Sequence, residues 1–425
     1  MHTKPIEHIR ALIGTNSSIT GEGFRARLNY IANLHKDLVV GSIKTGEIVF
    51  DWTVPKEWKI KSAYIEDITG NKILDLLDNN LYVINYSGPI NKVVNLKELN
   101  EHLHSLPELP NAVPYITSYY NEDWGFCIEH SKRLQLKDID YRVVIDSELF
   151  DGVLNYGEIK IQGRSEKEIL ISTYLCHPSM ANNELSGPSI AIELINYIKS
   201  IKNRKYSYRI IFIPETIGSI VYLSRHLNDL KKNVIYGLNL TCLGDRGGIS
   251  IMPTKYGDKP IDRLINYTLS DLGLTYKVHD YLQRGSDERQ FTSPKVDLPV
   301  ISLMRTKYGD FKEYHTSLDN LEYVDEDSLD HSLAVAERVI YVVEQNQVYS
   351  SCCYCEPQLG RRGLYPLIGT RLNSEQSKNL LNFLAYSDEK NDLIDVANYL
   401  KINFDKAIQI RDILIEHKLI AEVNE

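Results

Sequence analysis

Residues 168–200 read EILISTYLCHPSMANNELSGPSIAIELINYIKS. The opening run, Glu168–Thr173, is apolar and has the length of a buried strand. Between Ser189 and Ser200 the apolar residues recur on one helical face, so this part predicts a helix. Pro178 resists helix formation directly after the strand. The stretch therefore predicts a strand, a loop that carries His177, and a helix, which is the repeating unit of an α/β sheet.

The same alternation of strand and helix continues toward the C-terminus. Strands are predicted at Tyr208–Ile213, Val234–Leu240 and Val300–Met304, and helices at Ile217–Leu230, Ile261–Leu272 and Asp325–Val343. We therefore expect an α/β fold with a mixed, mostly parallel sheet and helices on both faces.

Two regions have a different pattern of apolar and turn residues. Residues 37–110 contain short β-like runs separated by turn residues and predict an inserted β-rich domain. Residues 360–425 contain three helical patterns and a terminal strand, which is typical of a winged-helix or helix-turn-helix module. The α/β core is then expected to comprise residues 1–36 and 111–350.

Composition limits the function. The chain of 425 residues has a net charge of −9, and its last predicted helix, Phe404–Lys418, mixes acidic with basic side chains. Nucleic acid is therefore not an expected partner. A protein partner for the C-terminal module is favoured, and assembly into a homo-oligomer stays open. No apolar run reaches the length of a membrane span, and the N-terminus lacks signal-peptide features, so we expect a cytoplasmic protein.

Six cysteines in a chain of this length do not make a disulfide framework. Three of them lie close together at Cys352, Cys353 and Cys355, but no second Cys or His pair stands at zinc-finger spacing. We interpret them as reduced thiols at a domain junction.

Three polar segments follow predicted strands, where α/β enzymes place their sites. The first carries His177 and the run Asn182-Asn183-Glu184, the second carries Glu215, and the third carries His315. Two His and one Glu are the ligand set of a catalytic zinc with a position left for water. Zinc lowers the pKa of such a water, and a free carboxylate nearby can accept its proton. Each residue taken alone is more typical of structural hydrogen bonding.

These segments resemble the zinc-dependent exopeptidases that include the bacterial leucyl aminopeptidases and glutamate carboxypeptidase. The resemblance covers residues 160–345 and rests on Cys176-His177, Asn183-Glu184-Leu185-Ser186-Gly187, Pro214-Glu215, Ser286-Asp287-Glu288-Arg289-Gln290-Phe291 and Tyr314-His315-Thr316. The whole chain is similar to bacterial aminopeptidase-like proteins that have an inserted β unit and a C-terminal winged helix and are often found in polysaccharide-biosynthesis clusters. The resemblance implies that His177, Glu215 and His315 bind zinc.

The chain departs from the family pattern at three positions. Asn183 stands at the bridging aspartate, Pro214 at the general-base glutamate and Thr241 at an aspartate ligand. These departures favour one zinc ion over two. Asn183 remains a candidate ligand through its amide oxygen, and Asp245 is a candidate replacement for the missing carboxylate.

The general base stays open among three carboxylates, namely Glu215, Glu184 and Asp287. Arg305, Tyr314 and Asn183 are the candidates for substrate binding, with Arg305 able to hold a carboxylate through two hydrogen bonds. An aromatic patch at Tyr119, Tyr120 and Trp124 either lines a substrate groove or packs in the core or an interface.

The sequence thus predicts a zinc-dependent, aminopeptidase-like hydrolase that acts on a small peptide or another amide. Two alternatives stay open. One is hydrolysis of an amide in a sugar- or lipid-linked intermediate of polysaccharide biosynthesis, and the other is a binding or regulatory protein on the same core with weakened catalysis.

Overall fold

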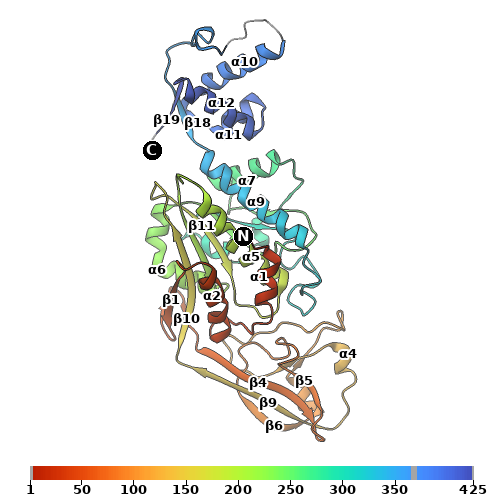
Figure 1. The fold of residues 1–425 in the computed structure, drawn as a ribbon. Coiled ribbons are helices and arrows are strands. Elements are labelled where there is room, and N and C mark those ends of the chain that lie inside the picture. The colour runs from red at the N-terminus through yellow and green to blue at the C-terminus, as the bar shows by residue number, and fades with distance from the viewer. Residues whose placement is uncertain (1–2, 365–370, 424–425) are drawn as a thin grey trace. The chain divides into compact units, whose positions relative to one another are not determined.

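The computed structural model describes residues 3–364 and 371–423. The chain divides into two compact units, the first formed by residues 1–262 and 276–334 and the second by residues 263–275 and 335–425 (Figure 1).

The first unit is built around an eight-stranded sheet of order β1-β10-β12-β11-β13-β16-β14-β15. These strands span Val39–Lys44 (β1), Val153–Ile161 (β10), Ser207–Ile213 (β12), Glu168–Tyr174 (β11), Val234–Leu240 (β13), Val300–Met304 (β16), Ser250–Met252 (β14) and Lys277–Val278 (β15). The four central strands, β12, β11, β13 and β16, run parallel, whereas β1, β10 and β14 pair antiparallel. Every residue of β11 and β12 is buried, which explains their continuous apolar pattern.

Helices cover this sheet. They are α1 (Pro5–Leu12), α2 (Glu22–Leu34), the π-helical turn η1 (Ala181–Leu185), α5 (Ser186–Ser200), α6 (Ile217–Asn233), the turn η2 (Tyr281–Gln283) and α8 (Glu288–Phe291). Helices α7 (Pro260–Asp271) and α9 (Glu326–Gln345) each run through a boundary between the two units. Helix α5 packs on β11, β12 and β13, and α6 packs on β10. The architecture confirms the predicted α/β class with its large mixed sheet.

A smaller antiparallel sheet of order β5-β4-β9-β6 lies in the same unit. Its strands span Lys72–Asp75 (β5), Glu57–Asp67 (β4), Asp140–Phe150 (β9) and Ile90–Asn95 (β6). Short elements complete this part of the chain, namely β2 (Ile48–Val49), β3 (Trp52–Thr53), α3 (Leu96–Glu101), β7 (Leu103–His104), β8 (Phe126–Cys127) and α4 (His130–Arg133). Strand β9 continues almost directly into β10, so one stretch of chain belongs to both sheets (Figure 1).

Strand pairing crosses the predicted boundary of the inserted domain. Strand β1 lies within residues 37–110 but pairs with β10 in the large sheet, and β9 lies outside that range but pairs with β4 in the small one. Local hydrophobic patterns identify both segments as strands, yet they carry no information about which sheet a strand joins, since pairing is a long-range property.

The second unit contains the predicted C-terminal module. Helices α10 (Arg371–Ala385), α11 (Leu393–Leu400) and α12 (Phe404–Glu416) accompany a three-stranded sheet of β18 (Asp388–Asp392), β17 (Val348–Ser351) and β19 (Ile420–Glu422), with a short turn η3 (Gly360–Arg362). The sheet begins at Val348, ahead of the expected start of the module at residue 360. The sequence pattern did not reveal strand β17, because it has four residues and two of them are serines.

The first turn of α12 is held by other parts of the second unit. The backbone N–H of Phe404 donates to Asp271 Oδ1 at 2.9 Å, and Arg338 bridges Asp271 at 3.0 Å and Asp405 at 2.8 Å. Phe404 is fully buried and its ring meets Tyr267 edge-on. The N-terminus of α12 is therefore occupied within the protein.

None of the helices in the described ranges combines the length and the apolarity that crossing a bilayer requires.

Candidate metal centre

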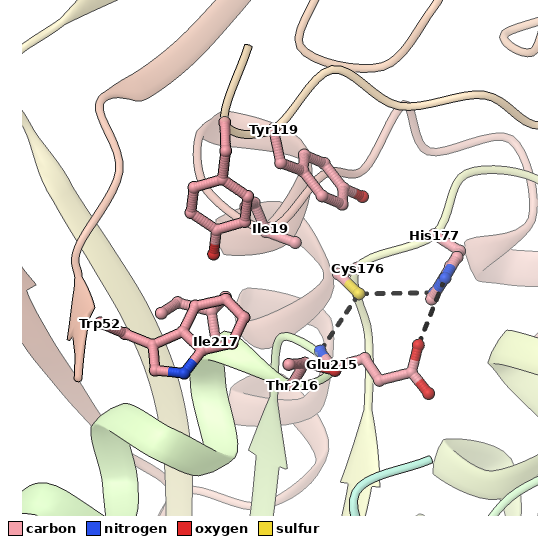
Figure 2. Close-up of a pocket in the computed structure, with 9 residues that line it drawn as sticks. Ile19, Trp52, Tyr119, Cys176, His177, Glu215, Thr216 and Ile217 are labelled. Carbon is pink, nitrogen blue, oxygen red and sulfur yellow. Dashed lines mark hydrogen bonds and ion pairs between the residues drawn. The ribbon is translucent and has the colours of Figure 1, made fainter. Parts of the chain in front are cut away.

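Two of the side chains predicted as zinc ligands, His177 and Glu215, face each other beyond the carboxyl ends of the central strands, and the ring of the third, His315, lies beside that of His177. His177 follows β11 and Glu215 follows β12, and the two approach with His177 Nε2 3.6 Å from Glu215 Oε2 (Figure 2). His315, from the loop before α9, has its ring centroid 5.2 Å from that of His177. The convergence agrees with the prediction that parallel strands deliver these residues to one edge of the sheet.

The two nitrogens of the His177 ring have different environments. Nδ1 lies 2.5 Å from Glu184 Oε2, and Nε2 faces Glu215. Burial lowers the pKa of His177, but its neighbours Cys176, Tyr115 and Glu184 outweigh burial, so the pKa lies well above its ordinary value. With its pKa raised, His177 in the metal-free protein carries a proton on each ring nitrogen, with Nδ1 facing Glu184 and Nε2 facing Glu215, and a metal at Nε2 would take the place of the second proton.

Glu184 is held in turn by a buried arginine. Arg27, which is fully buried in α2, approaches Glu184 Oε1 at 3.4 Å and donates to the carbonyls of Leu175 at 3.0 Å and His177 at 2.8 Å. Arg27 thus neutralises Glu184 and pins the backbone on both sides of Cys176. Sequence reasoning missed Arg27, since nothing in α2 signals a contact 150 residues away.

His315 is poised as a neutral ligand. Burial first, and then the charge of His177, lower its pKa to about 3. Its Nε2 is buried and has no hydrogen-bond partner among the described residues. The ring stacks on Tyr314 with centroids 3.9 Å apart and meets Tyr115 edge-on at 5.2 Å. A buried imidazole nitrogen without a hydrogen-bond partner calls for an explanation, and a bound metal ion is one that the sequence predicts.

The backbone at Glu215 is strained. The N–H of Ile217 donates to the carbonyl of Glu215 at 2.8 Å, and Thr216 between them has φ 65° and ψ −72°. This is the rare γ-turn with positive φ, which a β-branched residue adopts only when its surroundings enforce it. Arg289 donates to Thr216 Oγ1 at 2.6 Å and helps to hold the turn. Burial raises the pKa of the Glu215 carboxyl.

Asp287 lies behind this turn. Its Oδ1 accepts from the Thr216 N–H at 2.8 Å and from the Ser219 hydroxyl at 2.7 Å, while Oδ2 has no partner among the described residues. Burial, and after it the charge of Glu215, raise the pKa of Asp287 to about 7. Asp287 is fully buried and supports the Glu215 turn from behind.

Cys176, His177 and Glu184 form a tighter group, with one potential ligand atom of each lying within 4.8 Å of the others. Two observations argue against a metal among these three. Burial raises the pKa of the Cys176 thiol to about 11, and its Sγ already accepts the Glu215 N–H at 3.2 Å. Glu184 is engaged by His177 and Arg27. Among the described residues, the predicted set His177, Glu215 and His315 does not bring its ligand atoms within the same 4.8 Å of one another, so its zinc-binding role stays a prediction.

The remaining candidates lie in hydrogen-bond networks of their own. Asn183 Oδ1 accepts from Tyr174 Oη at 3.2 Å, and the carboxylate of Asp245 binds Asn182 Nδ2, the Gly247 N–H and Thr306. The Thr241 hydroxyl lies 2.5 Å from Tyr174 Oη. The structure does not bring Asn183 or Asp245 to the three converging side chains with a free oxygen, so their roles as zinc ligands stay predictions.

Arg305 and Tyr314 also differ in placement. The Arg305 guanidinium donates to the Ser328 carbonyl, His331 Nδ1 and Ser332 Oγ on α9, and it does not line the cavity beside His177. Tyr314 lies at the site, where its ring supports His315. Neither side chain is among the residues that line the cavity, so the substrate-binding roles of Tyr314 and Arg305 stay predictions.

A cavity of about 180 Å³ opens beside His177 and Glu215 (Figure 2). Its wall is largely aromatic and aliphatic, and its lining residues are Ile19, Trp52, Tyr119, Tyr120, Cys176, His177, Glu215, Thr216 and Ile217. Of the predicted aromatic patch, Tyr119 and Tyr120 line this cavity, whereas Trp124 stacks on His102 with centroids 3.8 Å apart. Trp52 was missed, because its hairpin β2–β3 lies far away in sequence.

The fold can now be compared with the folds of known proteins. The chain shares its fold with a zinc aminopeptidase from Bacillus subtilis, at 14% identity and a TM-score of 0.57 over 81% of this chain and 96% of that one. It is an aminopeptidase-like α/β protein with a C-terminal winged helix, and residues 347–422 match the winged helix-turn-helix family.

The particular family follows from residues 6–346, which match the family described as a domain of unknown function, DUF4910; the chain belongs to that family. A Clostridium acetobutylicum relative, named for polysaccharide biosynthesis and an aminopeptidase-like domain, is 45% identical over 95% of this chain and 92% of its own. A crystal structure from the same organism, named as that of a peptidase, is 44% identical with a TM-score of 0.92, covering 99% of this chain and 96% of that one.

Proposed function

We propose that the protein is a zinc-dependent hydrolase of amide bonds, with one zinc ion held by His177, Glu215 and His315. The proposal is supported by the 3.6 Å approach of His177 Nε2 to Glu215 Oε2, together with the ring of His315, whose centroid lies 5.2 Å from that of His177 and whose buried Nε2 has no hydrogen-bond partner among the described residues. Two neutral imidazoles and a carboxylate are the donor set of catalytic zinc sites.

Zinc at such a site supplies a Lewis acid that polarises a carbonyl and lowers the pKa of water. The residues of the chain orient the zinc ligands and shape the cavity. Glu184 keeps the Nδ1 proton of His177, so that Nε2 is available for coordination. Trp52, Tyr119 and Tyr120 exclude bulk water from one side of the cavity. The net reaction adds water across the amide, forming a C–O bond, breaking the C–N bond and releasing a carboxylic acid and an amine.

Proton transfer falls to the carboxyl groups around Glu215. With Glu215 on the metal and Glu184 bound to His177, Asp287 is the remaining carboxyl group beside Glu215; it lies behind the Thr216 turn and does not line the cavity, so a water molecule would have to relay the proton to it. Its Oδ2 has no partner among the described residues, and a pKa near 7 suits a group that accepts and returns a proton at neutral pH. Asp287→Asn is expected to lower turnover by about 10²- to 10⁴-fold while zinc affinity stays unchanged.

The test combines metal content with substrate screening. Protein prepared without chelators is expected to contain one equivalent of zinc, and a screen of that protein with both amino-acyl amides and N-acylated sugars is expected to show hydrolysis of an amide. His315→Ala should lose the zinc and retain the circular dichroism spectrum of the parent. Wild-type protein that takes up no zinc at equimolar concentration would overturn the proposal.

Two alternatives rest on separate observations. The polysaccharide-biosynthesis name of the Clostridium relative favours an amide in a sugar- or lipid-linked intermediate as the substrate. The engagement of Asn183 and Thr241 with Tyr174 favours a binding or regulatory protein with weakened catalysis, since two positions that carry metal ligands in related enzymes are tied up here. Zinc uptake without turnover on any amide would support the second alternative.

A further inference from the structure

A second cavity adjoins the one beside His177. Its volume is about 230 Å³, and the two cavities share Tyr119 and Tyr120 as lining residues. The phenol ring of Tyr120 is 56% exposed and meets Trp52 edge-on with centroids 5.6 Å apart. A ligand that reaches Glu215 in the first cavity can therefore continue past Tyr120 into the second.

The first cavity has few charges to offer. Among the described residues that line it, Glu215 is the sole carboxylate and no lysine or arginine is present. If Glu215 binds the metal, no group remains to pair with the ammonium of a peptide N-terminus or with the carboxylate of a C-terminus. An unpaired charge in such a site costs several kcal/mol. The wall therefore favours a neutral amide over the charged end of a peptide.

The second cavity is lined differently. Tyr120 lines it together with Thr53, Ser118 and Asn121, which carry hydroxyl and amide groups, and with the ion pair of Lys56 and Glu122, whose Nζ and Oε1 are 3.8 Å apart. Apolar faces with a few convergent polar groups fix the orientation of a small ligand. A sugar ring matches both features, since its C–H face can lie on an aromatic ring while its hydroxyls exchange hydrogen bonds at the edge.

We propose that the second cavity is a carbohydrate subsite, and that the substrate is a neutral amide attached to a sugar unit that occupies it. This inference rests on the proposed amide hydrolysis for the role of Glu215, but the sugar subsite is testable without catalysis. The name of the Clostridium relative agrees with carbohydrate as the ligand class.

The experiment measures binding to the full chain by calorimetry, with zinc and after its removal by chelator. The probes are N,N′-diacetylchitobiose, which is a neutral disaccharide with two amides, and leucine amide, which carries an ammonium. Chitobiose is expected to bind in both metal states, and leucine amide is expected to bind at least about tenfold more weakly to the zinc-loaded protein.

Variants locate the subsite. Tyr120→Ala should weaken chitobiose binding by about 2- to 10-fold, whereas Tyr120→Phe, which keeps the ring, should retain most of it. Tyr256→Ala serves as the matched control, because Tyr256 is 74% exposed and lines neither cavity. Zinc affinity should be the same in all three variants.

The outcomes separate the two proposals. Leucine amide hydrolysed by the zinc-loaded protein, with no chitobiose binding up to the millimolar range, overturns the subsite and leaves the hydrolase standing. Chitobiose binding that depends on Tyr120 in a protein that takes up no zinc supports the subsite and removes the hydrolase. Chitobiose binding that Tyr120→Ala leaves unchanged also overturns the subsite.

Discussion

Glu184 Oε2 lies 2.5 Å from Nδ1 of His177, and this contact decides which imidazole nitrogen faces the cavity. A carboxylate at Nδ1 holds a proton there and raises the basicity of Nε2, as in the carboxylate–histidine pairs of metal sites. Glu184 was a candidate general base from the sequence. That role stays a prediction; in the structure its carboxylate faces Nδ1 of His177, where it can orient the ring.

Glu184→Gln tests this orientation. An amide places either an oxygen or an NH₂ group against Nδ1 and carries no charge, so the tautomer of His177 is no longer enforced. We expect zinc affinity to fall by about 10- to 100-fold, measured by competition with a chromophoric chelator. Glu313→Gln, at a half-buried carboxylate two residues from His315, is the control and should bind zinc as the parent does. Equal affinities in Glu184→Gln and wild type would contradict the assignment.

Arg27→Met tests the buried cation behind Glu184. The substitution leaves the Glu184 carboxylate and the carbonyls of Leu175 and His177 without their donor in a region closed to water. The expected loss is about 3–5 kcal/mol of unfolding free energy, measured by urea denaturation. Arg246→Met, at an exposed ion pair with Asp325, should change the same quantity by less than about 0.5 kcal/mol.

Asp287→Asn tests the raised carboxyl pKa through the pH dependence of stability. The unfolded chain releases this proton near pH ~4, whereas the folded protein holds it to about pH 7. The folded state therefore binds more protons in this window, and its stability falls as the pH rises, by at most about 1.4 kcal/mol per pH unit.

The amide mimics the protonated carboxyl and can still accept from Thr216 and Ser219 through Oδ1. Urea unfolding of the zinc-free proteins should show the variant gaining stability over wild type from about pH 4 to about pH 7. A difference between the two proteins that does not change with pH would show that Asp287 titrates in the same range in both states.

The winged-helix module gives a prediction about nucleic acid. A DNA-reading helix presents its N-terminal residues to the major groove, but the first turn of α12 is bound to Asp271 and Arg338. Fluorescence anisotropy with duplex DNA at low and moderate salt should show no salt-dependent binding through α12. Binding that Lys406→Glu abolishes would contradict this expectation.

The sequence predicted the parts of the site that local patterns encode. Strands β11 and β12 and the placement of His177 and Glu215 at their ends follow from short apolar runs that stop at polar residues. The γ-turn at Thr216 and the π-helical turn at Ala181–Leu185 could not be predicted from local patterns, because residues distant in sequence hold these conformations.

Asn183 and Asp245 show a different limit. Their residue types and spacing suit metal ligation, and only the structure reveals that Tyr174, Asn182 and Thr306 already use their oxygens. The contact of Arg27 with Glu184 spans 157 positions and leaves no local pattern at either end.

The continuous passage of β9 into β10 has a consequence for ligand capture. One stretch of backbone is hydrogen-bonded into both sheets, and Glu57 of the small sheet accepts the N–H of Val153 at 2.9 Å where the two strands meet. The two sheets are therefore connected both by the chain and by a hydrogen bond, and we expect no hinge motion of one sheet relative to the other. We therefore expect the ligand cavity to be preformed, so that little of the binding free energy is spent on rearranging the protein.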